Sequence, residues 1–157
     1  MSAADEPVGY MERTRHYYRA LGFERDYVWA RFDQVPFAHL AKPLRDCRIA
    51  LITTAAPPDF DGVRKLWWGS TADPPGGLKT AHLAWDKEST HTDDRESFLP
   101  IEAASTLTAN GVIAGLTARF YGVPTTYSQR QTMADDAPSV LSLLRKDGAD
   151  AAVLSAL

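Results

Sequence analysis

The sequence predicts an α/β fold: a three-layer, Rossmann-like or flavodoxin-like domain with a mostly parallel sheet, preceded by an N-terminal helical arm. The run CRIALITT (47–54) is apolar at nearly every position rather than at alternate ones. That pattern is typical of a strand covered on both faces. The predicted strands and helices also alternate along the chain, which indicates parallel pairing. We therefore expect an arm and crossing segment in residues 1–45 and an α/β domain in residues 46–157.

The arm begins with a predicted helix, Tyr10–Leu21, whose apolar residues recur at helical spacing and whose end is marked by Gly22. The crossing segment DYVWARFDQVPFAHLAKPL (26–44) carries several bulky apolar side chains. A disordered linker is poor in such residues, so we expect an ordered segment.

The α/β domain contains one long loop region, AAPPDFDGVRKLWWGSTADPPGGLKT (55–80), between its first two predicted strands. Long loops inside compact domains are usually functional or mobile. Trp67 and Trp68 are neighbours, so in an extended backbone they cannot face the same side. The other predicted elements are a strand at Thr80–Trp85, a helix at Leu99–Ala109, an apolar segment within Val112–Phe120, a helix at Ala134–Lys146 and a last strand at Ala151–Leu157.

Composition excludes several classes of protein. The net charge of −3 provides no basic footprint for nucleic acid. No apolar run reaches the roughly 20 residues that cross a bilayer, and the N-terminus lacks the apolar core of a secretory signal. We therefore expect a cytoplasmic protein. The single cysteine, Cys47, excludes an intrachain disulfide and a multi-cysteine zinc site, and its place at the start of a core strand predicts a buried structural residue.

Candidate site residues follow the predicted strands, because ligands of open α/β sheets bind beyond the carboxyl ends of the strands. Thr53 and Thr54 end the first strand, and their hydroxyls would suit an anionic group. The loop WDKESTHTDD (85–94) brings acid/base groups: His91, with Asp86 or Asp93, is the candidate for proton transfer.

The stretch RFYGVPTTYSQRQ (119–131) offers hydrogen-bond donors for an anionic or amino-acid-like ligand: Arg119, Tyr121 and Tyr127. A turn whose tyrosines merely pack is the alternative. A metal site built from His82, His91 and the adjacent aspartates is a weaker possibility, since His82-x8-His91 is not a recognised zinc spacing.

Three blocks of the chain resemble the selenoprotein B family of glycine, sarcosine and betaine reductases, which is related to D-proline reductase. They are PLRDCRIALITTAAP (43–57), HLAWDKESTHTDDRESFLPIEAASTLTANGVIAGLTARFYGV (82–123) and APSVLSLLRKDGADAAVLSAL (137–157). Short members of the family commonly open with a helix like YMERTRHYYRALGF (10–23). The blocks occur in the family's order and span most of the chain.

The resemblance implies an oxidoreductase component that binds a small amino- or carboxy-bearing compound for reductive C–N bond cleavage. The family's redox cysteine or selenocysteine lies beyond the matching region, and no residue of this chain corresponds to it. We therefore expect another chain to supply it, either because the missing half is a separate polypeptide or because a selenocysteine codon is read as a stop. Otherwise the chain is a short homologue that binds without reducing.

The resemblance leaves the cofactor open. The last predicted strand has no helix after it, and an uncovered edge invites pairing, so we expect a homodimer or a partner subunit that completes the sheet and the active site. The alternative functions are a non-catalytic subunit that stabilises or positions a partner and a metal-dependent enzyme that uses His82 and His91.

Overall fold

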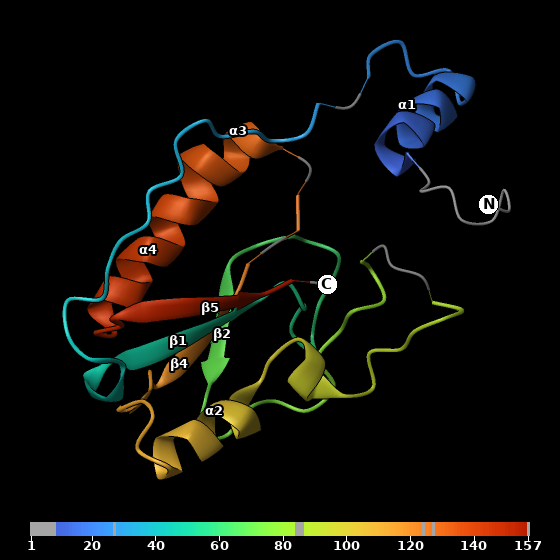
Figure 1. Cartoon of the computed structure of the whole chain (residues 1–157). Coiled ribbons are helices and arrows are strands. Elements are labelled where there is room, and N and C mark those ends of the chain that lie inside the picture. Colours follow the sequence, from blue (N-terminus) through green and yellow to red (C-terminus); the bar gives the residue numbers. More distant parts are fainter. Residues whose placement is uncertain (1–8, 27, 84–86, 124, 127, 157) are drawn as a thin grey trace, which may run out of the picture. The chain divides into compact units, whose positions relative to one another are not determined.

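The computed structural model of the chain describes residues 9–26, 28–83, 87–123, 125–126 and 128–156 (Figure 1). The chain divides into two compact units, Met1–Pro36 and Phe37–Leu157. The segment from Phe37 to Arg45, which the sequence placed with the arm, lies in the unit that holds the sheet.

The described residues of the N-terminal unit contain one helix, α1 (Tyr10–Ala20), which confirms the helix predicted there. None of the helix residues is buried, and Tyr10, Tyr17 and Tyr18 expose much of their rings. The end of α1 is tied to the chain after it by Arg19, whose Nε donates to Asp26 Oδ1 at 2.7 Å.

The second unit is a mixed α/β domain with a five-stranded, mostly parallel sheet, as predicted. The central strand β1 (Arg48–Thr53) is parallel to β3 (Gly115–Leu116), β4 (Arg119–Gly122) and β5 (Ala151–Ser155). The short β2 (Trp67–Ser70) is antiparallel to β4 and forms one edge. Since β5 occupies one side of β1 along most of its length, β3 and β4 share the other side.

A local irregularity separates β3 from β4. Between the pairs Ile49–Leu116 and Ile52–Tyr121, the second strand has two more residues than β1. These are Thr117 and Ala118, and their backbone carbonyls accept hydrogen bonds from the Thr71 hydroxyl at 2.6 Å and the Thr71 N–H at 3.1 Å. The carbonyls that leave the β1 ladder are thereby satisfied, and the end of β2 is anchored.

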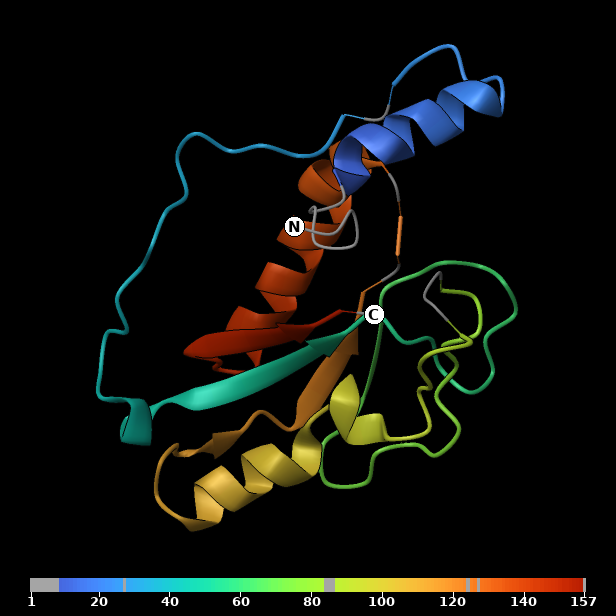
Figure 2. The same ribbon diagram turned by 45° about the vertical axis from the view of Figure 1, so that its right-hand side comes forward.

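Helices lie against both faces of the sheet, as the two views in Figures 1 and 2 show. On one face, Ala50, Ile52 and Tyr121 pack with Val140 and Leu144 of α4 (Ala137–Lys146). On the other face, Leu51 and Phe120 belong to a cluster with Ile101 of α2 (Ile101–Ala109). The continuous apolar run of β1 is therefore explained, because its successive side chains enter two different cores.

The helix after β4 runs from Gln129 to Lys146 in three consecutive parts: α3 (Gln129–Gln131), a π-helical turn (Thr132–Asp136) and α4. Ser128 caps it, since its hydroxyl accepts from Gln131 N at 3.2 Å. Pro138 lies just after the π-helical turn. A proline has no N–H and its ring collides with the carbonyl four residues earlier, so the regular hydrogen-bond pattern must change at this point.

Two parts of the long loop region differ from expectation. The strand predicted at Thr80–Trp85 is wrong in its described part, because residues 80–83 form a turn. The second strand is instead β2, which lies inside the segment that we read as a loop. Its residues confirm the inference about the two tryptophans: Trp67 packs against the α2-side core, whereas Trp68 is exposed and stacks with Arg119 at 5.2 Å from the ring.

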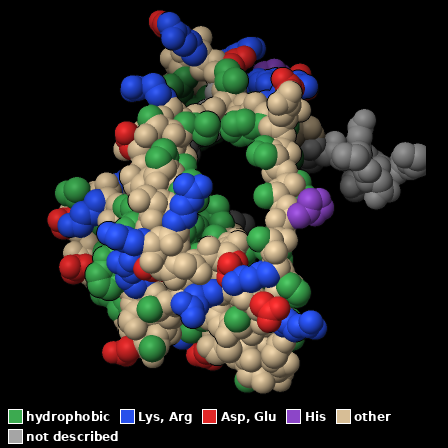
Figure 3. All heavy atoms as spheres, turned by 90° about the vertical axis from the view of Figure 1, so that its left-hand side faces the viewer, with side chains coloured by type: hydrophobic (Ala, Val, Ile, Leu, Met, Phe, Trp, Pro, Cys, Tyr) green, Lys and Arg blue, Asp and Glu red, His purple; other side chains and the backbone are tan. Residues whose placement is uncertain are grey.

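The surface is mixed in charge. Figure 3 shows one face on which Lys and Arg side chains are interspersed with Asp and Glu, without a broad area of one sign.

Two short 3₁₀ turns, Leu44–Asp46 and Arg95–Ser97, precede β1 and α2. Among the helices that the structure describes, none has the length and apolar character needed to cross a membrane.

Two glycines make room for aromatic rings between β2 and β4. Trp67 is paired with Gly122, and Gly69 with Phe120, so all four lie on the same face of the sheet. A Cβ added at Gly122 would stand 1.7 Å from Trp67 Nε1, and one at Gly69 would stand 2.5 Å from the Phe120 ring. The rings meet edge to face at 5.4 Å, and Trp67 Nε1 donates to Ala55 O at 3.0 Å.

Replacing Gly122 with alanine should destabilise the domain by about 3 kcal/mol, because the new methyl group displaces Trp67 and overpacks the core. Urea denaturation followed by circular dichroism measures this change. Gly76→Ala is the matched control, since nothing lies within 4 Å of its added Cβ, and its effect should stay below about 0.5 kcal/mol. Equal stabilities for the two variants would contradict this packing.

Candidate functional site

A cavity of about 70 Å³ lies beyond the carboxyl ends of β1 and β4. This is the end of the sheet at which open α/β proteins bind ligands. Its walls come from the loop after β1, from the start of β2, from His82 and from the segment after β4. The residues that line it include Thr54, Asp59, Phe60, Asp61, Arg64, Lys65, Trp67, His82 and Thr125.

The loop after β1 supplies the positive charge of the cavity through Arg64 and Lys65. Arg64 Nη1 donates a short hydrogen bond to the Thr125 carbonyl, so the guanidinium links this loop to the segment after β4. The guanidinium has five N–H donors, and one such bond leaves others for a ligand. Asp61 is turned to the backbone: it accepts from Val63 N at 2.9 Å, and this bond holds the pKa of the carboxyl below its ordinary value.

His82 forms another part of the wall. Its ring stacks on Phe60 with 4.8 Å between ring centres. Its Nδ1 is buried and has no hydrogen-bond partner among the described residues. Burial, and secondly the positive charge of Arg64, lowers the pKa of His82 below its ordinary value of 6.5, so the imidazole is neutral at pH 7.

Thr125 presents a second polar atom of the same kind. Its Oγ1 is buried and, within the described part of the chain, has no hydrogen-bond partner. Buried polar atoms are nearly always paired, so each exception calls for an explanation such as a water or an ion. Here two exceptions line one cavity beside a guanidinium, and that convergence makes the cavity the candidate functional site.

The two threonines predicted for the site have different positions. Thr54 lines the cavity, as the prediction requires. Thr53 is fully buried and does not line it. The Thr53 hydroxyl accepts from Ala55 N at 3.2 Å, so it stabilises the turn that leads the chain out of β1.

The predicted proton-transfer group lies elsewhere. His91 Nδ1 and Asp93 Oδ2 are 3.6 Å apart, and their side chains are 74% and 91% exposed. Neither residue lines the cavity, and Asp86 lies outside the described residues. The described residues also contain no group of three or more His, Cys, Asp or Glu side chains that could hold a metal ion. The roles suggested for these side chains stay predictions.

The predicted ligand-orienting residues Arg119 and Tyr121 lie within β4 rather than after a strand, because that strand runs on to Gly122. Both bind the carboxylate of Asp147, at the end of α4. Arg119 donates from Nε at 3.0 Å and from Nη2 at 2.5 Å, and the Tyr121 hydroxyl donates at 2.5 Å. Their donors thus join the sheet to the helix. Tyr127 lies outside the described residues.

Burial and hydrogen bonding together set the protonation of this cluster. Burial, with the hydrogen bond to Asp147 as a second cause, raises the pKa of Tyr121 to about 12. The hydrogen bonds from Arg119 hold the pKa of Asp147 below its ordinary value of 3.8. At neutral pH, Arg119 and Asp147 therefore form an ion pair, and the neutral Tyr121 hydroxyl donates to the Asp147 carboxylate.

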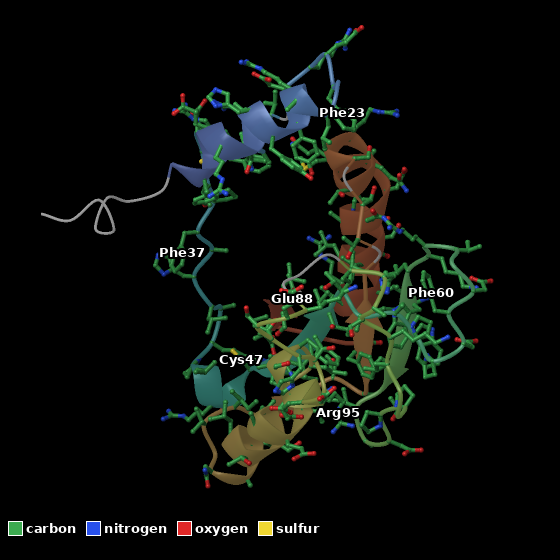
Figure 4. The ribbon with its side chains drawn as sticks, turned by 90° about the vertical axis from the view of Figure 1, so that its right-hand side faces the viewer. Phe23, Phe37, Cys47, Phe60, Glu88 and Arg95 are labelled. Carbon is green, nitrogen blue, oxygen red and sulfur yellow. The ribbon has the colours of Figure 1, made fainter. Side chains whose placement is uncertain are left out.

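Cys47 is buried at the amino-terminal side of β1, as predicted. Its Sγ lies 3.4 Å from the Pro43 carbonyl and 3.6 Å from that of Lys42. Figure 4 shows Cys47 well separated from Phe60, which belongs to the cavity wall. The thiol is therefore remote from the candidate site.

Sequence reasoning missed Arg64, Lys65 and Thr125. The first two lie in the long loop region, which we identified as functional or mobile without selecting residues in it. The signal that could have found them is the adjacent Arg-Lys pair within the loop region that follows the first predicted strand. No comparable signal marks Thr125, because its position depends on how the chain leaves β4.

Replacing Asp147 with asparagine should cost about 2 kcal/mol at pH 7, because Arg119 loses its charged partner. The carboxylate's contribution is complete above its ordinary pKa of 3.8 and is lost as pH falls through the lower folded value. The stability difference between wild type and Asp147→Asn, measured by urea denaturation, should therefore shrink from pH 7 to pH 3. Asp135→Asn, an exposed control, should cost little at either pH, and a difference that is constant with pH would contradict this account.

The site thus combines a guanidinium, an ammonium group, a neutral imidazole, two threonine hydroxyls and the carboxylates of Asp59 and Asp61 around one small cavity. Asp61 accepts from the Val63 N–H, and the guanidinium, ammonium and hydroxyl donors are suited to holding an anionic group. Comparison of the chain with protein-family models, with curated proteins and with solved structures found no match.

Proposed function

We propose that the α/β domain binds a small carboxylate-bearing compound in the cavity beyond β1, as a component of a reductase that cleaves C–N bonds. One observation supports this class of ligand: Arg64 lines the same cavity as two buried polar atoms that have no hydrogen-bond partner among the described residues, His82 Nδ1 and Thr125 Oγ1. The reaction class rests on the resemblance to the glycine, sarcosine and betaine reductases.

The sheet supports the position of the site. β1 lies between β4 and β5. The chain between β1 and β4 includes α2, the chain between β4 and β5 includes α4, and these helices pack on opposite faces of the sheet. We propose that the domain is a small three-layer relative of the flavodoxin-like arrangement. In such sheets the crevice beside the carboxyl end of the central strand is the ligand site.

The reductive step requires a thiolate or selenolate that this chain does not offer. Cys47 is the only cysteine of the sequence, and it is buried away from the cavity. In this proposal the chain binds and orients the substrate, while another chain supplies the redox residue. His91 with Asp93 would handle protons only if that partner lies against their exposed loop.

Glycine, sarcosine and betaine should each bind to wild-type protein at pH 7, and Arg64→Gln should weaken binding about tenfold, because a charge-assisted hydrogen bond is lost. NMR titration of the labelled protein measures both affinities. Shift changes should concentrate around the cavity.

Arg45→Gln is the matched control, since this arginine is exposed and does not line the cavity. It should bind as the wild type does. Absence of binding by all three compounds, or equal loss in both variants, would contradict the proposed ligand class.

A second candidate function is a non-catalytic subunit that stabilises or positions a partner. The observation that favours it is β5, which within the described residues pairs only with β1. Val153 and Leu154 of this edge strand are 46% and 62% exposed and lie on opposite faces. The strand contains no charged residue or proline that would block pairing with another chain.

If a second copy pairs with this edge, the wild type should sediment as a dimer in analytical ultracentrifugation. Val153→Lys should shift it towards the monomer, because charge on an edge strand opposes pairing. Val112→Lys, at a similarly exposed valine outside the sheet, should leave the dimer intact. A monomeric wild type at high concentration would contradict pairing between copies.

A further inference from the structure

Besides the positive charges of Arg64 and Lys65, the cavity wall has two buried polar side-chain atoms. The buried Nδ1 of His82 and the buried Oγ1 of Thr125 come from segments 43 residues apart, and both line the same 70 Å³ space. Arg64 joins these segments, because it lines the cavity and donates to the Thr125 carbonyl. Three side chains thus converge from three parts of the chain.

We infer that the cavity is an oxyanion site whose specificity is set by His82 and Thr125, which donate hydrogen bonds to an anionic group held by the charge of Arg64. This inference rests on the proposed function and names the groups that select the ligand. The Thr125 hydroxyl and the imidazole Nδ1 can both donate, and the guanidinium can only donate. A group with several acceptor oxygens, such as a carboxylate, phosphate or sulfate, satisfies all three together.

The size of the cavity agrees with a single such group. A cavity of about 70 Å³ is well below the roughly 300–1,000 Å³ of pockets that enclose a whole drug-sized ligand, so it suits the anionic head of a ligand. The remainder of the ligand would extend past the exposed loop. Trp67 and Val123 add apolar surface to the lining, and this limits the water that competes for the donors.

His82 also makes the binding sensitive to pH. Its free ring is neutral, because it is partly buried and faces Arg64. An oxyanion beside Nδ1 stabilises the charged imidazolium, so the complex takes up a proton and affinity rises as pH falls from 8 to 6. The other charged groups around the ring and its segment are Asp59, Asp61, Lys65, Lys79 and Lys87.

The test uses acetate and inorganic sulfate as probes, titrated into the full chain by NMR at pH 6 and pH 8. Acetate is almost fully ionised and sulfate keeps its charge over this range, so any pH dependence comes from the protein. We expect binding several-fold tighter at pH 6. His82→Asn keeps a donor near the Nδ1 position but cannot titrate, and its affinity should be the same at both pH values.

Thr125→Val should weaken binding about tenfold at both pH values, whereas Thr125→Ser keeps the hydroxyl and should bind as the wild type does. His39→Asn, an exposed histidine outside the cavity, should keep the pH dependence. The serine variant separates loss of the donor from loss of folding.

The outcomes separate the two proposals. Binding of acetate supports a carboxylate ligand, whereas binding of sulfate alone supports the oxyanion site and contradicts the carboxylate ligand of the proposed function. Binding that is independent of pH, or a pH dependence retained in His82→Asn, overturns the role of His82. Unchanged affinity in Thr125→Val overturns that of Thr125. If neither probe binds the wild type at either pH, both proposals fall.

Discussion

Every parallel pairing in the sheet is made by β1. Its six residues use both edges, with β5 along one and β3 and β4 along the other. They also use both faces, since Leu51 enters the α2-side core and Ile52 the α4-side core. β4 also has a strand on each edge and residues in both cores, but its only parallel partner is β1. The carboxyl end of this one strand therefore positions the loop that supplies most of the cavity, and the site depends on the core packing of β1.

The elements predicted best are those whose signals are local. The run CRIALITT, the helix over residues 99–109 and the last helix and strand each follow a pattern that needs no information from distant residues. β2 could not be found in this way. Its sequence WWGS forms a strand because Gly69 and Gly122 leave space for rings from the opposite strand. That complementarity exists only once β2 and β4 are paired, so it has no signature within either segment.

The site residues show the same contrast between local sequence signals and contacts that form only in the folded chain. The rule that ligands bind beyond the carboxyl ends of strands selected the end of the sheet at which the cavity lies, and Thr54 and His82 line that cavity. Arg119 and Tyr121 were placed after a strand because the irregularity at Thr117 hides the continuation of that strand into β4. Thr125 and Arg64 meet only through a contact between two loops. Loop contacts of this kind depend on tertiary structure, and no periodicity in the sequence encodes them.

The cavity has walls of very different stiffness. Trp67 belongs both to the cavity and to the packed core, where its ring is held by Phe120, Gly122 and the Ala55 carbonyl. Another part of the wall, from Asp59 to Lys65, is mostly exposed, and its contacts outside the segment include those with Thr125, Lys79 and His82. Ligand entry and exit then depend on the motion of the loop, whereas the fit of the bound group depends on a rigid surface. Loop substitutions that leave the ligand contacts of Arg64 intact should alter the rates of association and dissociation together, whereas substitutions beneath Trp67 should alter the binding equilibrium.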